Sequence, residues 1–195
     1  MNKREARVER KTRETQIELT LALDGTGQHD VSTGIGMLDH LLGTLAKHAG
    51  FDLWLRCTGD LHVDDHHTAE DCALALGQAV DEALGERRGI QRFGSAYAPL
   101  DEALARAVVD LSGRPWSEVS LDLAGRELGQ LAAENAEHVL RSLAAVLRAS
   151  IHVDVLRGNN DHHKAEAAFK ALALALRQAV TPTGSPDVPS TKGVL

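Results

Sequence analysis

Aromatic side chains are scarce in this sequence: phenylalanine, tryptophan and tyrosine together make up 3% of its 195 residues. The 43% hydrophobic content is enough for a sizeable core, which must be built mostly from alanine, leucine and valine. A groove that stacks nucleic-acid bases needs exposed rings on a basic surface, whereas this chain has a net charge of −7 and no basic run. We therefore expect no nucleic-acid partner.

Cysteine is also rare, with only Cys57 and Cys72 in the chain. Their spacing fits no cysteine-based zinc motif. The sequence contains neither a segment resembling a secretory signal nor an apolar stretch long enough to span a membrane. These absences favour a reducing, cytoplasmic location and no membrane partner.

Histidine, in contrast, is plentiful, and six of the ten histidines follow a repeat. Residues 65–70 read Asp-His-His-Thr-Ala-Glu, and residues 161–166 read Asp-His-His-Lys-Ala-Glu. The two runs start 96 residues apart, and each opens an apolar stretch with helical spacing. Two single histidines, His40 and His138, precede apolar runs at nearly the same offset. The pattern predicts two duplicated half-domains.

The repeated side chains are metal ligands by type, because imidazole and carboxylate together suit borderline transition ions. Neighbouring residues of a helix project about 100° apart, so adjacent histidines are expected to serve two different metals, whereas the glutamate that follows reaches either. The repeated ligands are therefore enough for two metal sites per chain, and the ligands of one site need not come from one chain. The eight candidates are His40, His66, His67, Glu70, His138, His162, His163 and Glu166. Because a lone histidine is more often structural, we assign structural or supporting roles to His29, His48, His62 and His152, which lack the repeat.

Alternation and turn residues predict the other elements. Residues 15–23 alternate polar and apolar side chains, as a half-buried strand does, and the run Asp-Gly-Thr-Gly at residues 24–27 is typical of a hairpin turn. Further strands are predicted at residues 31–34, 51–57, 92–97, 103–111, 119–123 and 151–156, and helices up to residue 48, from residue 65 to near 85, and at 135–149 and 161–180. The charged residues 1–13 are expected to form in part a mobile arm.

Five motifs, in this order, resemble those of the imidazoleglycerol-phosphate dehydratases of histidine biosynthesis: residues 34–40 (Gly-Ile-Gly-Met-Leu-Asp-His), 64–71, 110–115 (Asp-Leu-Ser-Gly-Arg-Pro), 158–166 and 189–195. The resemblance implies an α+β fold of duplicated half-domains, each a four-stranded mixed sheet with helices on one face, and the helices sandwiched between the two sheets. We accordingly divide the chain into a first half-domain with its N-terminal arm (1–91), a second half-domain (92–181) and a phosphate-binding tail (182–195). Periodicity alone does not predict the strand order.

The resemblance also implies an activity. The family comprises lyases that remove water from D-erythro-imidazole glycerol phosphate, a small phosphorylated imidazole, to give imidazole acetol phosphate. It implies two Mn²⁺ ions per active site, each held by three histidines and a glutamate from the eight candidates, with sites completed between neighbouring subunits of a 24-subunit homo-oligomer. The ligand types alone do not rank manganese above iron, cobalt or zinc, nor do they say which ligands share an ion.

The chemistry explains why metal ions are needed, because no side-chain base readily removes the substrate's C2 proton at neutral pH. Cations on both ring nitrogens favour the imidazolate, which can expel the C3 hydroxyl to give a diazafulvene-like intermediate; loss of the C2 proton then gives an enol that becomes the ketone. By resemblance, Glu14 matches the family's proton-transferring glutamate. Without the resemblance, its position in the sequence would indicate only an ordinary exposed acid.

The phosphate requires cationic and hydroxyl groups, which by resemblance are Arg92, Arg114, Lys170, Ser190 and Lys192. Taken alone, each arginine would read as an ordinary surface charge. The loop that precedes Ser190 is expected to be mobile until phosphate recruits the tail. One departure from the family is Gly43-Thr44, where the family often has a polar pair ending in glutamine; the Thr44 hydroxyl could replace that contact.

Two other functions would use the same ligands. A hydrolase that activates water between two metals would not need Arg92, Arg114 and Lys192 together. A non-catalytic metal-binding assembly would need neither phosphate contacts nor Glu14.

Overall fold

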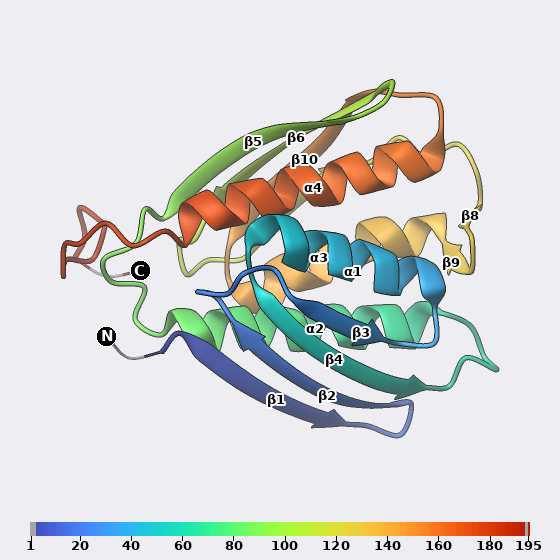
Figure 1. Cartoon of the computed structure of the whole chain (residues 1–195), viewed down its shortest axis with the longest axis horizontal. Helices are drawn as coiled ribbons and strands as arrows, with labels where there is room; N and C mark the ends of the chain where they lie inside the picture. Colours follow the sequence, from blue (N-terminus) through green and yellow to red (C-terminus); the bar gives the residue numbers. More distant parts are fainter. Residues whose placement is uncertain (1–2, 194) are drawn as a thin grey trace.

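The computed structural model describes residues 3–193 and 195, so Met1 and Asn2 of the expected arm and Val194 of the expected tail lie outside the described residues. Within the described residues, four helices lie between two four-stranded sheets (Figure 1). A short hairpin of β8 (Glu127–Leu128) and β9 (Leu131–Ala132) is added at one end of the molecule.

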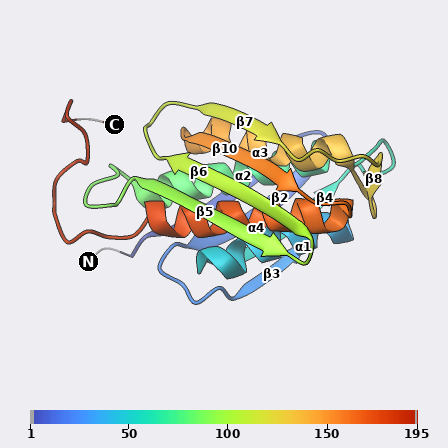
Figure 2. The same ribbon diagram turned by 90° about the horizontal axis from the view of Figure 1, so that it is seen from above.

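The two halves repeat one topology. The first half contains β1 (Glu5–Lys11), β2 (Thr15–Ala22), β3 (His29–Ser32), α1 (Gly36–Ala49), β4 (Asp52–Gly59) and α2 (His66–Leu84). The second contains β5 (Phe93–Leu100), β6 (Ala103–Asp110), β7 (Trp116–Ser120), α3 (Ala133–Leu147), β10 (Ser150–Arg157) and α4 (Asp161–Ala179). The sheet orders are β1-β2-β4-β3 and β5-β6-β10-β7, and Figure 2 shows the second sheet lying over the helices. The predicted α+β fold with duplicated halves is confirmed.

Each sheet is mixed in the same way. The edge strand β3 pairs in parallel with β4, and β7 pairs in parallel with β10, while the other pairings within the two sheets are antiparallel. In β2 every second residue from Thr15 to Leu21 is buried, so one face of the strand is apolar and faces the helices. The alternation in the sequence therefore positions the first sheet over the helical layer.

The helices pair across the two halves rather than within them. α2 packs against α3, and α1 packs against α4 (Figure 1). Small residues allow a close approach: a Cβ added to Gly77 of α2 would lie 2.8 Å from the carbonyl oxygen of Leu143 in α3. This pairing brings side chains from both halves into the middle layer of the molecule.

The N-terminal segment differs from the expected arm. Glu5–Lys11 forms β1, which pairs with β2 along its whole length, and it buries Val8 against the core. The expectation of a mobile arm is therefore wrong for Glu5–Lys11, because the buried side chain of Val8 and the pairing with β2 hold this strand in place.

The turn after β2 also differs from its expectation, because it does not close a hairpin. β3 lies beside β4, not beside β2, and the carboxylate of Asp52 accepts hydrogen bonds from the backbone N–H groups of Thr26 and Gln28, which hold the loop in place. The strand expected at residues 119–123 instead spans Trp116–Ser120, the range over which β7 is in register with β10.

Among the described residues, no helix combines the length and the apolar character that crossing a bilayer requires.

The core assignment can be tested with two leucines. Leu172 of α4 is fully buried, whereas Leu156 of β10 is 46% exposed. Leu172→Ala leaves a cavity, so we expect it to lower the free energy of unfolding by about 2–5 kcal/mol, measured by chemical denaturation. Leu156→Ala is the matched control and should cost less than about 1 kcal/mol. Equal losses in the two variants would contradict this account of the core.

Candidate metal centre

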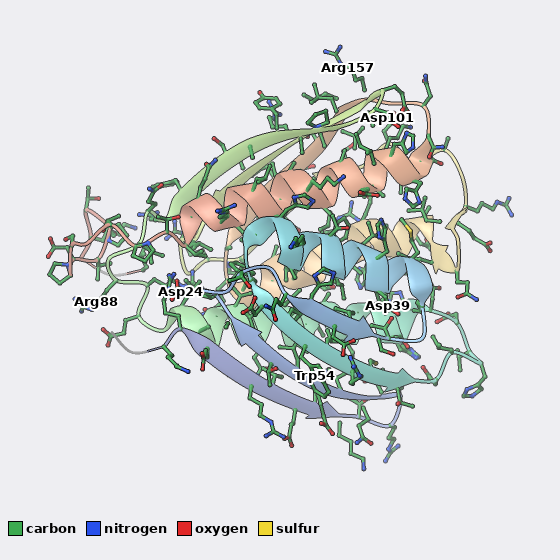
Figure 3. All side chains as sticks on the ribbon, viewed as in Figure 1. Asp24, Asp39, Trp54, Arg88, Asp101 and Arg157 are labelled. Atoms are coloured by element: carbon green, nitrogen blue, oxygen red, sulfur yellow. The ribbon has the colours of Figure 1, made fainter. Side chains whose placement is uncertain are left out.

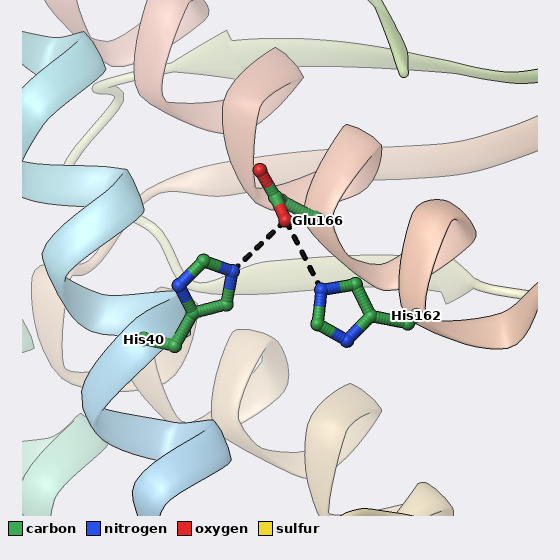
Figure 4. Close-up of side chains that lie close together, drawn as sticks. All are labelled: His40, His162 and Glu166. Atoms are coloured by element: carbon green, nitrogen blue, oxygen red, sulfur yellow. Dashed lines mark hydrogen bonds and ion pairs between the residues drawn. The ribbon is translucent and has the colours of Figure 1, made fainter. Parts of the chain in front are cut away.

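Three candidate ligands from two helices meet between α1 and α4. His162 and Glu166 are four residues apart on α4 and therefore share one side of that helix, and His40 projects toward them from α1 (Figure 4). Glu166 Oε2 lies 2.9 Å from His40 Nε2 and 3.3 Å from His162 Nε2. The two imidazole rings stack with their centroids 5.4 Å apart. We call His40, His162 and Glu166 the first cluster.

The same arrangement occurs between α2 and α3. Glu70 Oε1 lies 3.0 Å from His138 Nε2, and the rings of His66 and His138 stack with centroids 4.8 Å apart. His66 Nδ1 also lies 2.9 Å from Asn135 Oδ1. We call His66, Glu70 and His138 the second cluster. In both clusters the single histidine comes from one half and the histidine–glutamate pair from the other, so the two clusters are equivalent with the halves exchanged.

The second histidine of each pair points away from its neighbour. The rings of His66 and His67 make an angle of 72°, and those of His162 and His163 an angle of 83°. His67 Nδ1 lies 3.0 Å from Asp60 Oδ2, and His163 Nδ1 lies 2.7 Å from Glu102 Oε2. A carboxylate on one ring nitrogen fixes the ring and directs the other nitrogen outward, as is usual for metal-binding histidines.

Each outward nitrogen has a second carboxylate near it. Glu14 Oε1 lies 3.6 Å from His67 Nε2, and Asp101 Oδ2 lies 3.9 Å from His163 Nε2. Glu14 is in the turn between β1 and β2, and Asp101 is in the corresponding turn between β5 and β6, where Figure 3 labels it. Glu14, which by resemblance matches the family's proton-transferring glutamate, therefore lies beside one of the candidate ligands.

The carboxylates that orient these histidines were not predicted from the sequence. Asp60 follows the Gly59 that ends β4, and Glu102 precedes β6; neither position carries a repeat or a motif. The only available signal was that both are acidic residues in tight turns near the predicted strands.

Hydrogen bonds to carboxylates set the electrostatics of the outward histidines. The bond to Asp60 raises the pKa of His67, and the bond to Glu102 raises the pKa of His163. In return, the backbone N–H of Asn160, the imidazole of His163 and the backbone N–H of Asn159 lower the pKa of Glu102 to about 2. Glu102 is therefore ionised at neutral pH and holds His163 in place.

Glu166 of the first cluster is also ionised. Its partial burial raises its pKa, but hydrogen bonds from Lys170 and His40 outweigh that effect and lower the pKa to about 2. Lys170 Nζ lies 2.7 Å from Glu166 Oε1. A carboxylate that stays charged next to two imidazoles is a suitable partner for a cation.

The donor set fits a divalent transition ion. In each cluster one atom from every member lies within 4.8 Å of the others, and two imidazole nitrogens with one carboxylate oxygen suit manganese, iron, cobalt or zinc. Three protein ligands leave coordination positions for further ligands. The structure brings six of the eight predicted ligands into two such groups, while His67 and His163 lie outside them.

The predicted phosphate-binding residues lie mostly at the other end of the molecule. Arg92 donates hydrogen bonds to the carboxylate of Asp110 at 2.7 and 3.1 Å and to the carbonyl oxygen of Pro189 at 2.8 Å. A Cβ on Gly113 would lie 2.7 Å from the carbonyl carbon of Leu195, so the tail runs past the loop that carries Arg114. Arg92 and Arg114 thus lie beside the segment that carries Ser190 and Lys192.

This group of basic residues is far from the clusters of the same chain. The backbone N–H of Arg92 bonds to the carbonyl oxygen of Ala179, which is thirteen residues after Glu166 on α4, a distance of about 20 Å along the helix axis. Lys170 is the exception, because it lies on the cluster side, bonded to Glu166.

The remaining histidines belong to neither cluster. His29 Nδ1 lies 3.1 Å from the carbonyl oxygen of Gly27, and a Cβ on Gly43 would lie 2.8 Å from the ring of His29. Gly43, which departs from the family pattern, thus leaves room for this imidazole. Burial lowers the pKa of His48.

Comparisons with known proteins give one consistent result. The model of the imidazoleglycerol-phosphate dehydratase family matches residues 33–176. The chain is 59% identical over 192 residues to an imidazoleglycerol-phosphate dehydratase of Phytophthora nicotianae, covering 98% of this chain and 42% of that relative. It is 56% identical to one of Candida glabrata, covering 96% and 98%. A solved structure from Pyrococcus furiosus is similar with 39% identity and a TM-score of 0.84, covering 96% of this chain and all of that one.

The two outward histidines give a test in the metal-free protein. NMR titration should show the pKa of His163 above its ordinary value of 6.5, and Glu102→Gln should lower it while leaving the pKa of His67 unchanged. Asp60→Asn should do the reverse. Stabilisation by the Glu102–His163 pair is complete between about pH 4.5 and pH 6.5, the ordinary pKa values of the two groups. It is lost at higher pH as His163 loses its proton and at lower pH as Glu102 gains one. Equal effects of both substitutions on both histidines would contradict the assigned pairs.

Proposed function

The chain belongs to the imidazoleglycerol-phosphate dehydratase family and is a hydro-lyase of histidine biosynthesis that acts on a small phosphorylated imidazole, and from that premise we propose that it works with two Mn²⁺ ions per active site. The observation that carries the proposal is the pair of equivalent clusters, each with two histidines and one glutamate. The first cluster would hold one ion and the second cluster the other.

The ions would supply the acidity that the substrate ring lacks, as the imidazolate route expected from the sequence requires. The protein's own contribution is to hold the donors in place. Glu166 is fixed by Lys170, and His66 is fixed by Asn135, so neither side chain has to be ordered when a cation binds.

We propose that the outward histidines complete the clusters of neighbouring subunits in a 24-subunit homo-oligomer. Each of these imidazoles is oriented by a carboxylate, Asp60 or Glu102, yet neither belongs to a cluster of its own chain. The separation of about 20 Å between the clusters and the basic residues supports the same proposal. The three-carbon chain between the imidazole and the phosphate of the substrate is too short to connect them within one subunit.

Glu14 is proposed to carry the proton. Its carboxylate is about half exposed, so a bound substrate can reach it, and Oε1 lies 3.6 Å from the nitrogen of His67 that would face an ion. In this position Glu14 Oε1 could accept the proton that leaves C2 and return it at the next step.

The phosphate is proposed to bind at the tail. Three of the five N–H groups of Arg92 bond to Asp110 and Pro189, and the other two would hold phosphate oxygens. Arg114 is exposed and its guanidinium could bind the phosphate through two hydrogen bonds. Ser190 and Lys192 would then order over the substrate, while Lys170 would contact it from the cluster side.

Two further expectations stay proposals. We propose the boundary between half-domains at residues 91 and 92, because β5 of the second sheet begins at Phe93. We propose a cytoplasmic location, which is compatible with Cys57 and Cys72 as free thiols.

The role of Glu14 is tested by Glu14→Gln, which keeps the size of the side chain but cannot take up a proton. We expect dehydration of imidazole glycerol phosphate to fall by about 10²–10⁴-fold while the manganese content per subunit is unchanged. Glu9→Gln, an exposed acid on β1, is the matched control and should keep full activity. Dehydration by the metal-loaded protein that is lost in Glu14→Gln would also separate this function from a hydrolase and from a metal-storing assembly. Only the assembly needs no Glu14, and the hydrolase does not account for Arg92, Arg114 and Lys192 together. Full activity of Glu14→Gln would contradict the proposed function.

Shared sites are tested by combining two impaired variants. One variant carries Glu14→Gln, and the other carries Arg114→Ala and Lys192→Ala, which weaken phosphate binding. When the two chains are co-expressed, up to about a quarter of the sites receive intact parts from different chains, so activity should exceed the sum of the separate variants. Activity equal to that sum would show that each site is built from one chain.

A further inference from the structure

A buried carboxylate that is not a candidate ligand lies directly after Glu70. Asp71 is 5% exposed, and its two oxygens are both bonded: Thr15 Oγ1 donates to Oδ2 at 2.5 Å, and Arg10 Nε donates to Oδ1 at 2.9 Å. A buried charge is costly unless it is paired in this way. The three side chains join strands β1 and β2 to the first turns of α2.

This contact fixes the turn that carries Glu14. Thr12 Oγ1 accepts hydrogen bonds from the backbone N–H groups of Glu14 and Thr15 at 3.1 and 2.9 Å, so the turn is rigid. The backbone N–H of Asp60 bonds to the carbonyl oxygen of Glu14 at 3.0 Å. Asp71 attaches the next residue, Thr15, to the helix that carries His67. The backbone of Glu14 is therefore held on both sides relative to this imidazole.

The other half of the molecule shows that the fold does not need these polar groups. The strand registers pair Glu5 with Ala22 and Phe93 with Asp110, so residues of β1 and β2 correspond to residues 88 positions later in β5 and β6. Arg10 and Thr15 then correspond to Ala98 and Ala103, and the histidine repeat matches Asp71 with Ala167. All three alanines are buried.

The difference between the halves coincides with a difference in the turn. In the second half, Glu102 corresponds to Glu14, and its carboxylate is bonded to Nδ1 of His163. In the first half Asp60 makes that bond to His67 instead, which leaves the Glu14 carboxylate beside Nε2. In the second half the carboxylate near the outward nitrogen comes from a different turn residue, Asp101, at 3.9 Å. The half in which the Glu14 position itself faces the outward nitrogen is the half with the buried polar group.

We propose that Asp71 is a positioning residue that, through Thr15, fixes Glu14 relative to His67. The proposal rests on the proposed proton transfer by Glu14. A displacement of about 1 Å at such a group can cost about 100-fold in rate, whereas substrate binding through the phosphate should be little affected. Loss of Asp71 should therefore lower kcat far more than it raises KM.

The experiment uses the full, manganese-loaded protein. Thr15→Ala removes the hydroxyl that Asp71 holds, and Thr15→Ser keeps a hydroxyl at that place. A triple variant, Arg10→Ala with Thr15→Ala and Asp71→Ala, copies the three alanines of the second half, so it leaves no buried polar group without a partner. Arg7→Ala, on the exposed face of β1, is the control.

We expect Thr15→Ala and the triple variant to lower kcat by about 10–100-fold, with KM within about threefold and the manganese content unchanged. Thr15→Ser should recover most of the rate, and Arg7→Ala should match the unmodified protein. In the Glu14→Gln background the triple substitution should lower the residual kcat no further, because the two changes act through one group.

Two results would overturn the proposal. One is a metal-loaded triple variant whose kcat is within about twofold of the unmodified protein; the other is a loss of kcat that follows loss of manganese. If the triple variant is active while Glu14→Gln is inactive, the positioning role fails and the proposed function stands. Full turnover by Glu14→Gln would instead contradict the proposed function itself.

Discussion

The candidate site depends on a carboxylate from one half bonding an imidazole from the other, Glu166 to His40 and Glu70 to His138. These contacts require α1 beside α4 and α2 beside α3, because each helix carries only part of a cluster. Helices that must meet across the halves lie in the middle layer, and the two sheets can cover only the outer faces. The duplicated fold and the candidate metal centre are thus consequences of the same pairing.

Duplication gives two equivalent clusters, but the turns beside the outward histidines differ between the halves. One half carries Glu14 with its carboxylate beside the outward nitrogen of His67, and the other has turned the matching Glu102 onto the inner nitrogen of His163. The surroundings have diverged in the same places: a bonded polar group on one side, small apolar residues on the other. The proposed proton transfer by Glu14 would therefore use one of the two turns, while both clusters would bind a cation.

The members of the two clusters could be singled out from the sequence because their signal is local. Two histidines and a glutamate within one and a half helical turns recur in both halves, and the 100° step between neighbours correctly separates His66 from His67. Which ligands share a cluster, and that Asp60 and Glu102 orient the outward rings, depends on contacts between distant segments that no local pattern encodes. The parallel pairing of β3 was missed for the same reason, since its partner β4 lies beyond a whole helix.

The central claim is that residues of both halves bind two divalent ions. Anomalous X-ray diffraction at the manganese absorption edge, on crystals of the manganese-loaded protein, tests it most directly. We predict two peaks per chain, one touching His40, His162 and Glu166 and the other touching His66, Glu70 and His138. Fully loaded crystals with no anomalous peak at either cluster, or with manganese bound elsewhere, would contradict the account.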